Sequence, residues 1–333
     1  MPVSVVVPVL NEERHLAEAV HAALDQRYDG PIDVALALGP STDRTDEVAH
    51  ALREQDSRVV LVANPGGRTP DALNAAVAAT SSPVVVRVDG HGVLDPDYVA
   101  TAVDLLRQTG AANVGGLMDA EGSTAFERAV AAAMTSPLGV GAARFHVGGA
   151  PGPADTVYLG VFRREWLQHV GGYDPEFIRA QDWEMNHRIR QDGGLVWFSP
   201  RLRVSYRPRG TVRALARQYR DYGRWRRVVA RTHAGTVNLR YLAPPLALVG
   251  VVAGAVVGAT LTPWGLLLPG GYAGVVLLGT LVVGRRPGTR LPLRARLLLP
   301  VVLPTMHLSW GWGFLTSPAS IVPSRERAEG VEE

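Results

Sequence analysis

The chain has 333 residues, 47% apolar and 20% charged, so it is long enough for one large or two ordinary domains and too apolar to be disordered. It has no cysteine, and all 34 basic residues are arginine, which excludes a disulfide framework, a cysteine-ligated zinc site, a thiol nucleophile, a catalytic lysine and a Walker-type phosphate loop. The net charge of +3 combines residues 1–200, with 15 Arg and 26 Asp/Glu (net −11), and residues 201–333, with 19 Arg and 5 Asp/Glu (net +14). This division excludes a uniformly basic nucleic-acid binder and predicts an acidic unit followed by a basic one.

Short apolar segments alternate with helical patterns in the first 120 residues. The helices are expected to begin after caps at Asn11, at Ser41 or Thr42, at Thr69-Pro70-Asp71 and at Asp95-Pro96-Asp97. This alternation predicts an α/β unit with a mostly parallel sheet covered by helices on both faces. The expected strands are residues 3–9, 32–38, 58–62, 83–88 and 112–118.

Ligands of such sheets bind beyond the carboxyl ends of the strands. The segments at those ends are residues 8–13, 38–43, 64–68 and 89–91. No G-x-G-x-x-G follows the first strand, so an ordinary dinucleotide-binding fold is not expected.

Asp89-Gly90-His91 ends the fourth expected strand. A carboxylate and an imidazole two residues apart can face one divalent cation, and Mg or Mn in such a site keeps positions open for phosphate. The alternative is a simple turn, since Asp-Gly is a common turn dipeptide.

Asp182 lies near the start of an expected helix, in the segment AQDWEMNHRIRQDGG, where Glu184 and Arg188 are spaced for an ion pair. From spacing alone, an ordinary amphipathic helix with Asp182 stabilised by the helix dipole is the simpler interpretation. The later segment 206–225 is basic and aromatic, which suits contacts with a membrane surface or a diphosphate.

Two uncharged segments, 241–284 and 297–324, follow the basic region, and His307 is the only titratable side chain of the second. A bilayer-spanning helix needs about 20 apolar residues. We therefore expect a membrane region at 231–320 and a polar tail at 321–333. The expected helices lie at about residues 241–262, 264–284 and 297–316.

Pro300 and Pro304 interrupt the third apolar segment, so it either spans the membrane or re-enters it. Arginines precede the first span and lie between the second and third, whereas the connection between the first two has none. The positive-inside rule then predicts a multi-pass protein of the plasma membrane with its N-terminal domain in the cytoplasm.

Taken together, several of these segments resemble the inverting glycosyltransferases of family 2, which have a GT-A (nucleotide-diphospho-sugar transferase) fold. The resemblance covers about residues 1–230, and a D-x-H motif, a YRPR segment and C-terminal membrane helices are similar to bacterial exopolysaccharide glucosyltransferases of the succinoglycan type. The segments that carry it are VSVVVPVLNEERHL (3–16), PSTDRT (40–45), RTPDALNAAV (68–77), VRVDGHGVLDPDYV (86–99), GVFRREWLQHVGGYDPEF (160–177) and QDWEMNHRIRQDGG (181–194).

The resemblance implies a role for individual residues. Asp89 and His91 would hold a divalent metal, Mn or Mg, on the diphosphate of a sugar nucleotide. Asp182 would be the catalytic base, although Gln181 replaces the acid that usually precedes it. The residues implied to line the donor site are Pro8, Asn11, Glu12, Arg68, Asn74 and Asp89.

Two positions depart from the family pattern. Leu38-Gly39 replaces the two acids that commonly contact the base and ribose of a uridine nucleotide. Arg224-Trp225 matches the end of a Gln-x-x-Arg-Trp motif, but Asp221 stands in place of the glutamine.

The resemblance therefore implies a membrane-anchored, metal-dependent hexosyltransferase. It would move a sugar from a nucleotide-diphospho-sugar to a lipid-linked saccharide, a polyprenyl phosphate or a glycan, in the synthesis of a cell-surface polysaccharide. No nucleic-acid partner is expected. Two alternatives remain: a non-catalytic membrane-bound nucleotide-sugar binding or assembly subunit, and a nucleotidyltransferase.

Overall fold

The computed structural model describes residues 1–285 and 291–321. The chain divides into two compact units, each made of two segments. Met1–Asp119 and Gly148–Tyr206 form the first unit, and Ala120–Val147 and Arg207–Glu333 form the second. Most of the polar tail expected at 321–333 lies outside the described residues.

The first unit is built on a sheet that has nine strands among the described residues, in the order β3-β2-β1-β4-β8-β6-β9-β5, with β7 paired to β9. β1 pairs in parallel with β2 and β4, and β2 pairs in parallel with β3, whereas β8 runs antiparallel to β4 and β6. The sheet is thus parallel where the sequence predicts it and mixed beyond β4. The strands are β1 (Val3–Val9), β2 (Ile32–Leu38), β3 (Val59–Ala63), β4 (Val84–Arg87), β5 (Val93–Leu94), β6 (Asn113–Ala120), β7 (Gly152–Pro153), β8 (Tyr158–Arg163) and β9 (Val196–Tyr206).

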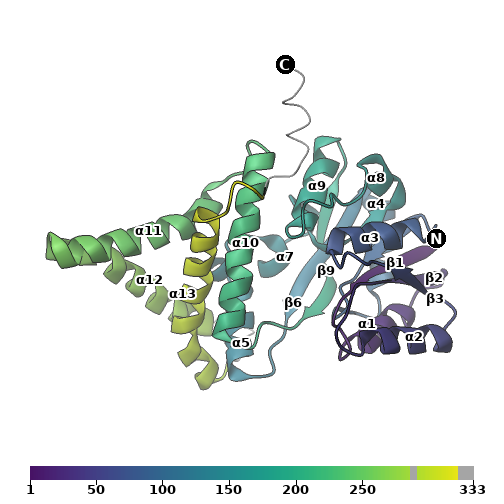
Figure 1. Ribbon diagram of the computed structural model, residues 1–333, viewed down its shortest axis with the longest axis horizontal. Helices are drawn as coiled ribbons and strands as arrows, with labels where there is room; N and C mark the ends of the chain where they lie inside the picture. Colours follow the sequence, from purple (N-terminus) through teal and green to yellow (C-terminus); the bar gives the residue numbers. More distant parts are fainter. Residues whose placement is uncertain (286–290, 322–333) are drawn as a thin grey trace, which may run out of the picture. The chain divides into compact units, whose positions relative to one another are not determined.

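Helices cover both faces of this sheet, because the apolar strands present buried side chains alternately to each side (Figure 1). α1, α2 and α4 pack on the face that contains Val5 and Val7, and α3, α8 and α9 pack on the face that contains Val6 and Val85. These layers confirm the expected GT-A arrangement of a mostly parallel sheet. The helices are α1 (Leu16–Leu24), α2 (Thr45–Gln55), α3 (Thr69–Ala78), α4 (Tyr98–Thr109), α8 (Arg164–His169) and α9 (Gln181–Gln191).

The expected helix caps are only partly right. Asn11 does not cap α1, which begins later at Leu16; instead Asn11 has a left-handed backbone with φ of 58°. The N-cap of α2 is Arg44, where Ser41 or Thr42 was expected, and that of α3 is Arg68 rather than Thr69. The loops before α1 and α2 extend further than the pattern of apolar residues indicates, whereas α3 begins one residue earlier than expected.

The second unit is helical. α10 begins at a Thr211 cap whose side chain accepts a hydrogen bond from the Ala214 N–H, and residue 230, where the sequence analysis places the domain boundary, falls within this helix. Three further helices are long and apolar enough to cross a membrane: Leu239–Thr260, Pro263–Gly284 and Leu293–Leu315. The elements are α5 (Ala125–Met134), α6 (Pro137–Val140), α7 (Arg144–Val147), α10 (Val212–Thr232), α11 (Leu239–Thr260), a 3₁₀ turn η1 (Pro263–Leu266), α12 (Leu267–Gly284) and α13 (Leu293–Leu315).

Candidate active site

The loops that follow β1 and β2 are tied together at the carboxyl edge of the sheet. The Asn11 side-chain oxygen accepts a hydrogen bond of 2.8 Å from the Thr42 N–H, and the Glu12 N–H donates to the Thr45 hydroxyl at 2.7 Å. A pocket of about 310 Å³ opens here, lined by residues 11–15 and Asp43. The left-handed backbone of Asn11 is therefore part of a loop that borders a pocket.

The tip of β4 lies against this loop. The Glu12 carboxylate and the His91 ring nitrogen Nδ1 are 2.8 Å apart, and the side chains are 18% and 32% exposed. Gly90 makes this contact possible, because a Cβ at that position would lie 2.9 Å from Glu12 Cγ. The structure thus brings together Glu12 and His91, for which the family resemblance implies contacts with the nucleotide and the metal respectively.

The last residue of β4, Arg87, is buried and contacts two carboxylates. Its guanidinium donates to Asp182, at the start of α9, and to Asp89 at 3.1 Å. The side chains of the two acids are each 26% exposed, whereas that of Arg87 is 4% exposed. One buried cation therefore holds the expected catalytic base and the expected metal ligand side by side.

The charges of this cluster shift its proton equilibria. Burial raises the pKa of Asp182 to about 6; the attraction of Arg87 opposes this rise, and the negative charge of Asp89 adds to it. Burial by itself lowers the pKa of Arg87, but the two carboxylates more than compensate and the net pKa is above its usual value. A carboxylate with this pKa is ionised at neutral pH and can accept a proton, which is what a general base requires.

A second set of contacts fixes the loop beside Arg87. The ring of Tyr173 lies under the guanidinium, 5.9 Å from its carbon. Asn74 bonds the Tyr173 backbone twice, accepting from its N–H at 2.8 Å and donating to its carbonyl at 2.7 Å. Arg188 donates to the Gly172 carbonyl at 2.8 Å and is itself held by the buried Glu184 carboxylate at 2.6 Å. Asn74, expected beside the donor, thus supports the wall of the carboxylate cluster.

The donor set at the tip of β4 fits a divalent ion that is also bound by phosphate. Within residues 1–285 and 291–321, no three His, Asp or Glu side chains come together as a complete metal site. Asp89 keeps a second oxygen that Arg87 does not contact, and the His91 imidazole follows two residues later on the same strand tip. One carboxylate and one imidazole with open positions are the kind of partial shell that Mg or Mn completes with substrate phosphates.

The remaining expected site residues lie at the same edge of the sheet. Pro8 is near the end of β1, paired with Ala37 of β2. Arg68 precedes α3 and forms an ion pair of 2.7 Å with Asp71. The loop after β2 and the loop after β3 approach each other closely at Gly39, since a Cβ at this position would lie 3.3 Å from Gly67 Cα. The usual acid at Gly39 would crowd this passage.

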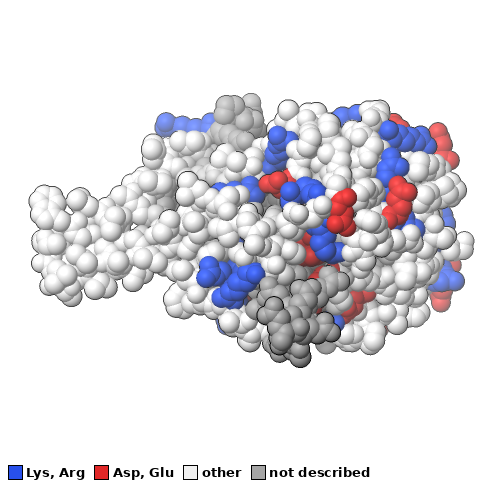
Figure 2. All heavy atoms as spheres, turned by 90° about the horizontal axis from the view of Figure 1, so that it is seen from above, with Lys and Arg blue, Asp and Glu red and all other residues white. Residues whose placement is uncertain are grey.

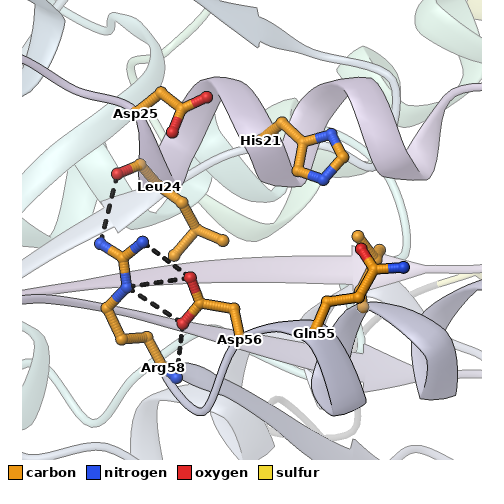
Figure 3. A pocket seen from close by; sticks show the side chains of 7 residues that line it. His21, Leu24, Asp25, Gln55, Asp56 and Arg58 are labelled. Carbon is orange, nitrogen blue, oxygen red and sulfur yellow. Dashed lines mark hydrogen bonds and ion pairs between the residues drawn. The ribbon is translucent and has the colours of Figure 1, made fainter.

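The opposite edge of the sheet has a different pocket, of about 180 Å³ (Figure 3). Its residues come from the ends of α1 and α2 and the start of β3, and Arg58 is held by Asp56 at 2.7 Å and by the Leu24 carbonyl. Because ligands of parallel sheets bind at the carboxyl edge, this pocket is not part of the candidate site.

Arg87 and Tyr173 are two residues of the site that the sequence patterns did not indicate. Arg87 is visible in retrospect as the single charge within the apolar segment VVVRV, because a charge inside a buried strand requires a partner. Tyr173 gives no comparable signal, since it lies in a loop whose position depends on contacts with distant residues.

Comparisons with known proteins identify the family and the fold. Residues 4–171 match the model of the Glycosyl transferase family 2. The chain belongs to glycosyltransferase family 2. It is 31% identical over 312 residues to the succinoglycan biosynthesis protein ExoA of Rhizobium meliloti strain 1021, with 93% of each chain covered.

Two more distant relatives of this family 2 chain share less of its sequence. It is 21% identical over 251 residues to a dolichyl N-acetyl-α-D-glucosaminyl phosphate 3-β-D-2,3-diacetamido-2,3-dideoxy-β-D-glucuronosyltransferase of Methanococcus voltae, covering 73% of this chain and 77% of that protein. The mannosyltransferase PcManGT of Pyrobaculum calidifontis, solved with GDP-mannose and Mn²⁺, superposes with a TM-score of 0.61 at 21% identity, over 91% of this chain and 86% of that one. This likeness confirms the GT-A fold.

Proposed function

We propose that the protein is a membrane-anchored inverting glycosyltransferase that moves a sugar from a nucleotide-diphospho-sugar to a lipid-linked saccharide or glycan in the synthesis of a cell-surface polysaccharide. The observation that carries this proposal is the Asp182 carboxylate, partly buried beside Arg87 and next to Asp89 at the carboxyl edge of the sheet. It joins a proton acceptor and a candidate phosphate-metal site in one cluster.

The chemistry follows from the position of these groups. Asp182, ionised at neutral pH, takes the proton of an acceptor hydroxyl as the oxygen attacks the anomeric carbon of the donor. A divalent metal held by Asp89 and His91 would supply positive charge to the leaving diphosphate. A single displacement inverts the anomeric configuration, so an α-linked donor gives a β-glycoside. A covalent glycosyl-enzyme is not required, which agrees with Gln181 in place of a second acid.

The donor is proposed from the fold and from relatives. The PcManGT complex contains GDP-mannose and Mn²⁺, which supports a metal-bound nucleotide sugar in the corresponding fold. In this chain Leu38 and Gly39 stand where the family commonly has two acids that contact the base and ribose of a uridine nucleotide. Gly39 also lies in close contact with the loop at Gly67. The proposed class of donor is therefore a nucleotide-diphospho-sugar.

The acceptor is proposed from the helices and from relatives. ExoA is named for succinoglycan biosynthesis, and the name of the M. voltae enzyme contains a dolichyl phosphate sugar. The helices α11 and α12 suit membrane insertion, which would hold the enzyme at the surface where a polyprenyl-linked saccharide is found. The positive-inside rule favours a cytoplasmic catalytic unit in the plasma membrane.

Release of nucleoside diphosphate by the detergent-purified protein tests this proposal. Uridine, guanosine and thymidine diphospho-sugars are supplied with Mn or Mg and a bacterial lipid extract, and a parallel reaction contains a chelator. Nucleoside diphosphate from one donor, dependent on metal and lipid extract, is expected. Pyrophosphate in its place would indicate a nucleotidyltransferase.

A non-catalytic nucleotide-sugar binding or assembly subunit is the second candidate, favoured by the loss of acids at Leu38-Gly39. It predicts nucleotide-sugar binding without release of diphosphate under any of these conditions.

A further inference from the structure

The three apolar helices of the second unit differ in how much of their surface the protein covers. α11 has a mean hydropathy of 2.1, and the segment Pro263–Gly284, made of η1 and α12, has one of 2.0; 11% and 17% of their most apolar stretches are buried. α13 has a mean hydropathy of 1.2, and 39% of its most apolar stretch is buried. α11 and α12 form a hairpin that projects from the rest of this unit, and its projecting part shows no charged side chain in Figure 2.

α13 packs against α10 more extensively than any other two helices do in the part of the chain that the structure describes. The two helices meet backbone to backbone: a Cβ at Gly313 would clash with the Arg220 carbonyl, and one at Gly223 would clash with the Trp310 carbonyl. Beyond these glycines, the Ser317 hydroxyl donates to the Arg224 carbonyl at 3.1 Å. α10 and α13 therefore occupy the same environment.

That environment is not the core of a bilayer, because arginines occur along the whole of α10. Its first and last arginines are 18 positions apart, about 27 Å at the helical rise, which is close to the thickness of the hydrocarbon core. A helix with charges throughout this length is strongly disfavoured there. The arginines are Arg213, Arg217, Arg220, Arg224, Arg226, Arg227 and Arg231.

The contacts of α13 with the hairpin lead to the same conclusion. Near the end of α13, Trp310 stacks on Tyr241 with ring centroids 6.4 Å apart. Tyr241 lies in the first turn of α11, so the end of α13 contacts the start of α11. Near the beginning of α13, Arg296 packs on Gly284, the last residue of α12. The start of α11 and the end of α12 are the two ends at the base of the hairpin. α13 thus lies across this base, whereas a third span parallel to α11 would bring Trp310 towards the hairpin tip.

The middle of α13 contacts a segment outside the apolar helices. His307 Nε2 lies 2.8 Å from the carbonyl oxygen of Leu138 in the four-residue helix α6, and Met306 packs beside Gly139. A short turn between loops, such as α6, is tolerated within a membrane only where protein covers it.

The opposite face of α13 carries exposed apolar side chains that fall in one stripe at the helical repeat. They include Leu293, Leu297, Val301, Trp312 and Leu315.

We infer that α13 does not cross the membrane but lies along its surface, with this apolar stripe in the interface, so that only α11 and α12 span. The inference rests on the membrane anchoring in the proposed function. It implies that residues after α13 are on the same side of the membrane as residues before α11. The occupant of the stripe is the lipid surface, and the arginines of α10 lie beside it where anionic headgroups attract them.

Single cysteines test this topology, since the natural chain has none. Ala234→Cys lies before α11, Thr262→Cys lies at the hairpin tip and Ser320→Cys lies after α13. Each variant of the full-length protein is labelled with a membrane-impermeant maleimide in right-side-out and inverted vesicles. The inference predicts that Ala234→Cys and Ser320→Cys react from one side and Thr262→Cys from the other. Ser320→Cys reacting together with Thr262→Cys would overturn it.

The same variants separate failure of this inference from failure of the anchoring on which it rests. If the hairpin does not insert, all three cysteines react from one side, and Thr262→Cys reports that outcome independently of Ser320→Cys.

Depth measurements distinguish a surface helix from a re-entrant one, which would also return Ser320 to the first side. An environment-sensitive fluorophore is attached at Leu297→Cys, Thr305→Cys or Leu315→Cys, with Val249→Cys of α11 as the deep control. Quenching by lipids spin-labelled at shallow and deep positions is then compared. Equal, shallow depths at the three α13 positions are expected, at least about 5 Å above the control. A maximum depth at Thr305→Cys comparable with that of Val249→Cys would overturn the inference.

Discussion

Replacing Arg87 by Met should move the acid limb of the pH–activity profile to higher pH. In the natural protein the pKa of Asp182 is about 6, so about 90% of this base is ionised at pH 7. A neighbouring arginine typically lowers the pKa of an aspartate by about 1 to 3 pH units. Without it, the pKa would be about 7 to 9, and between about half and about 1% of the base would be ionised at pH 7. Sugar transfer at pH 7 should therefore fall by about twofold to a hundredfold and recover towards pH 9.

The assay is kcat for sugar transfer from pH 5 to pH 10, at saturating donor and metal. Arg163→Met is the matched control, because this half-buried arginine donates to the Ala111 and Leu106 carbonyls and contacts no carboxylate of the cluster. The control should lose stability without a shift of the acid limb. Arg87→Lys keeps a positive charge and should restore part of the neutral-pH activity.

Two results would refute this reasoning. An acid limb in Arg87→Met at the same pH as in the natural protein would show that the guanidinium does not set the proton equilibrium of the base. An equal loss of kcat at every pH would indicate that Arg87 acts through structure alone.

Three further substitutions test the site and its support. Gly172 has a φ of +74°, and the Cβ of Gly172→Ala would lie 2.7 Å from the Asn74 side-chain oxygen. This substitution should lower the free energy of unfolding by about 1 to 3 kcal/mol, measured by denaturant unfolding. An unchanged midpoint would contradict the tight packing of this loop. Glu184→Leu leaves Arg188 buried without its carboxylate and should cost about 3 to 5 kcal/mol, and the double variant with Arg188→Leu should recover part of the loss; additive losses would argue against the pair. Asp89→Asn should raise the Mn concentration for half-maximal activity at least about tenfold while leaving the midpoint of unfolding nearly unchanged, and an unaltered metal requirement would place the metal elsewhere.

The parallel half of the sheet could be predicted from the sequence because its strands are apolar on both faces. The expected segments 3–9 and 32–38 agree with β1 and β2, and 58–62 and 83–88 agree with β3 and β4 to within two residues. The antiparallel half gave weaker signals. β8 lies between β4 and β6, and its pairing depends on residues far apart in the chain rather than on local pattern.

The positions of the expected site residues could also be anticipated, because the ends of parallel strands meet at one edge. Glu12 and His91 come within hydrogen-bonding distance although 79 positions separate them. The contact of Arg87 with both Asp89 and Asp182 could not be derived from spacing, because it depends on where α9 begins relative to β4.

The topology of the third apolar helix could not be predicted from the sequence either. Hydropathy alone gives a segment long enough to span, and its prolines leave the alternative of a re-entrant helix open. The packing of α13 against the arginine-rich α10 and its contacts at the base of the hairpin are the observations that favour a helix on the membrane surface, and neither can be read from hydropathy.

The central claim is that Asp182 takes the proton from an acceptor hydroxyl during sugar transfer. The most direct measurement compares the natural protein with Asp182→Asn, using the donor that supports activity and monitoring labelled sugar in the lipid fraction together with donor affinity. The account predicts that transfer falls by about 10² to 10⁴ while donor binding changes little. Transfer by Asp182→Asn at the rate of the natural protein would contradict the account.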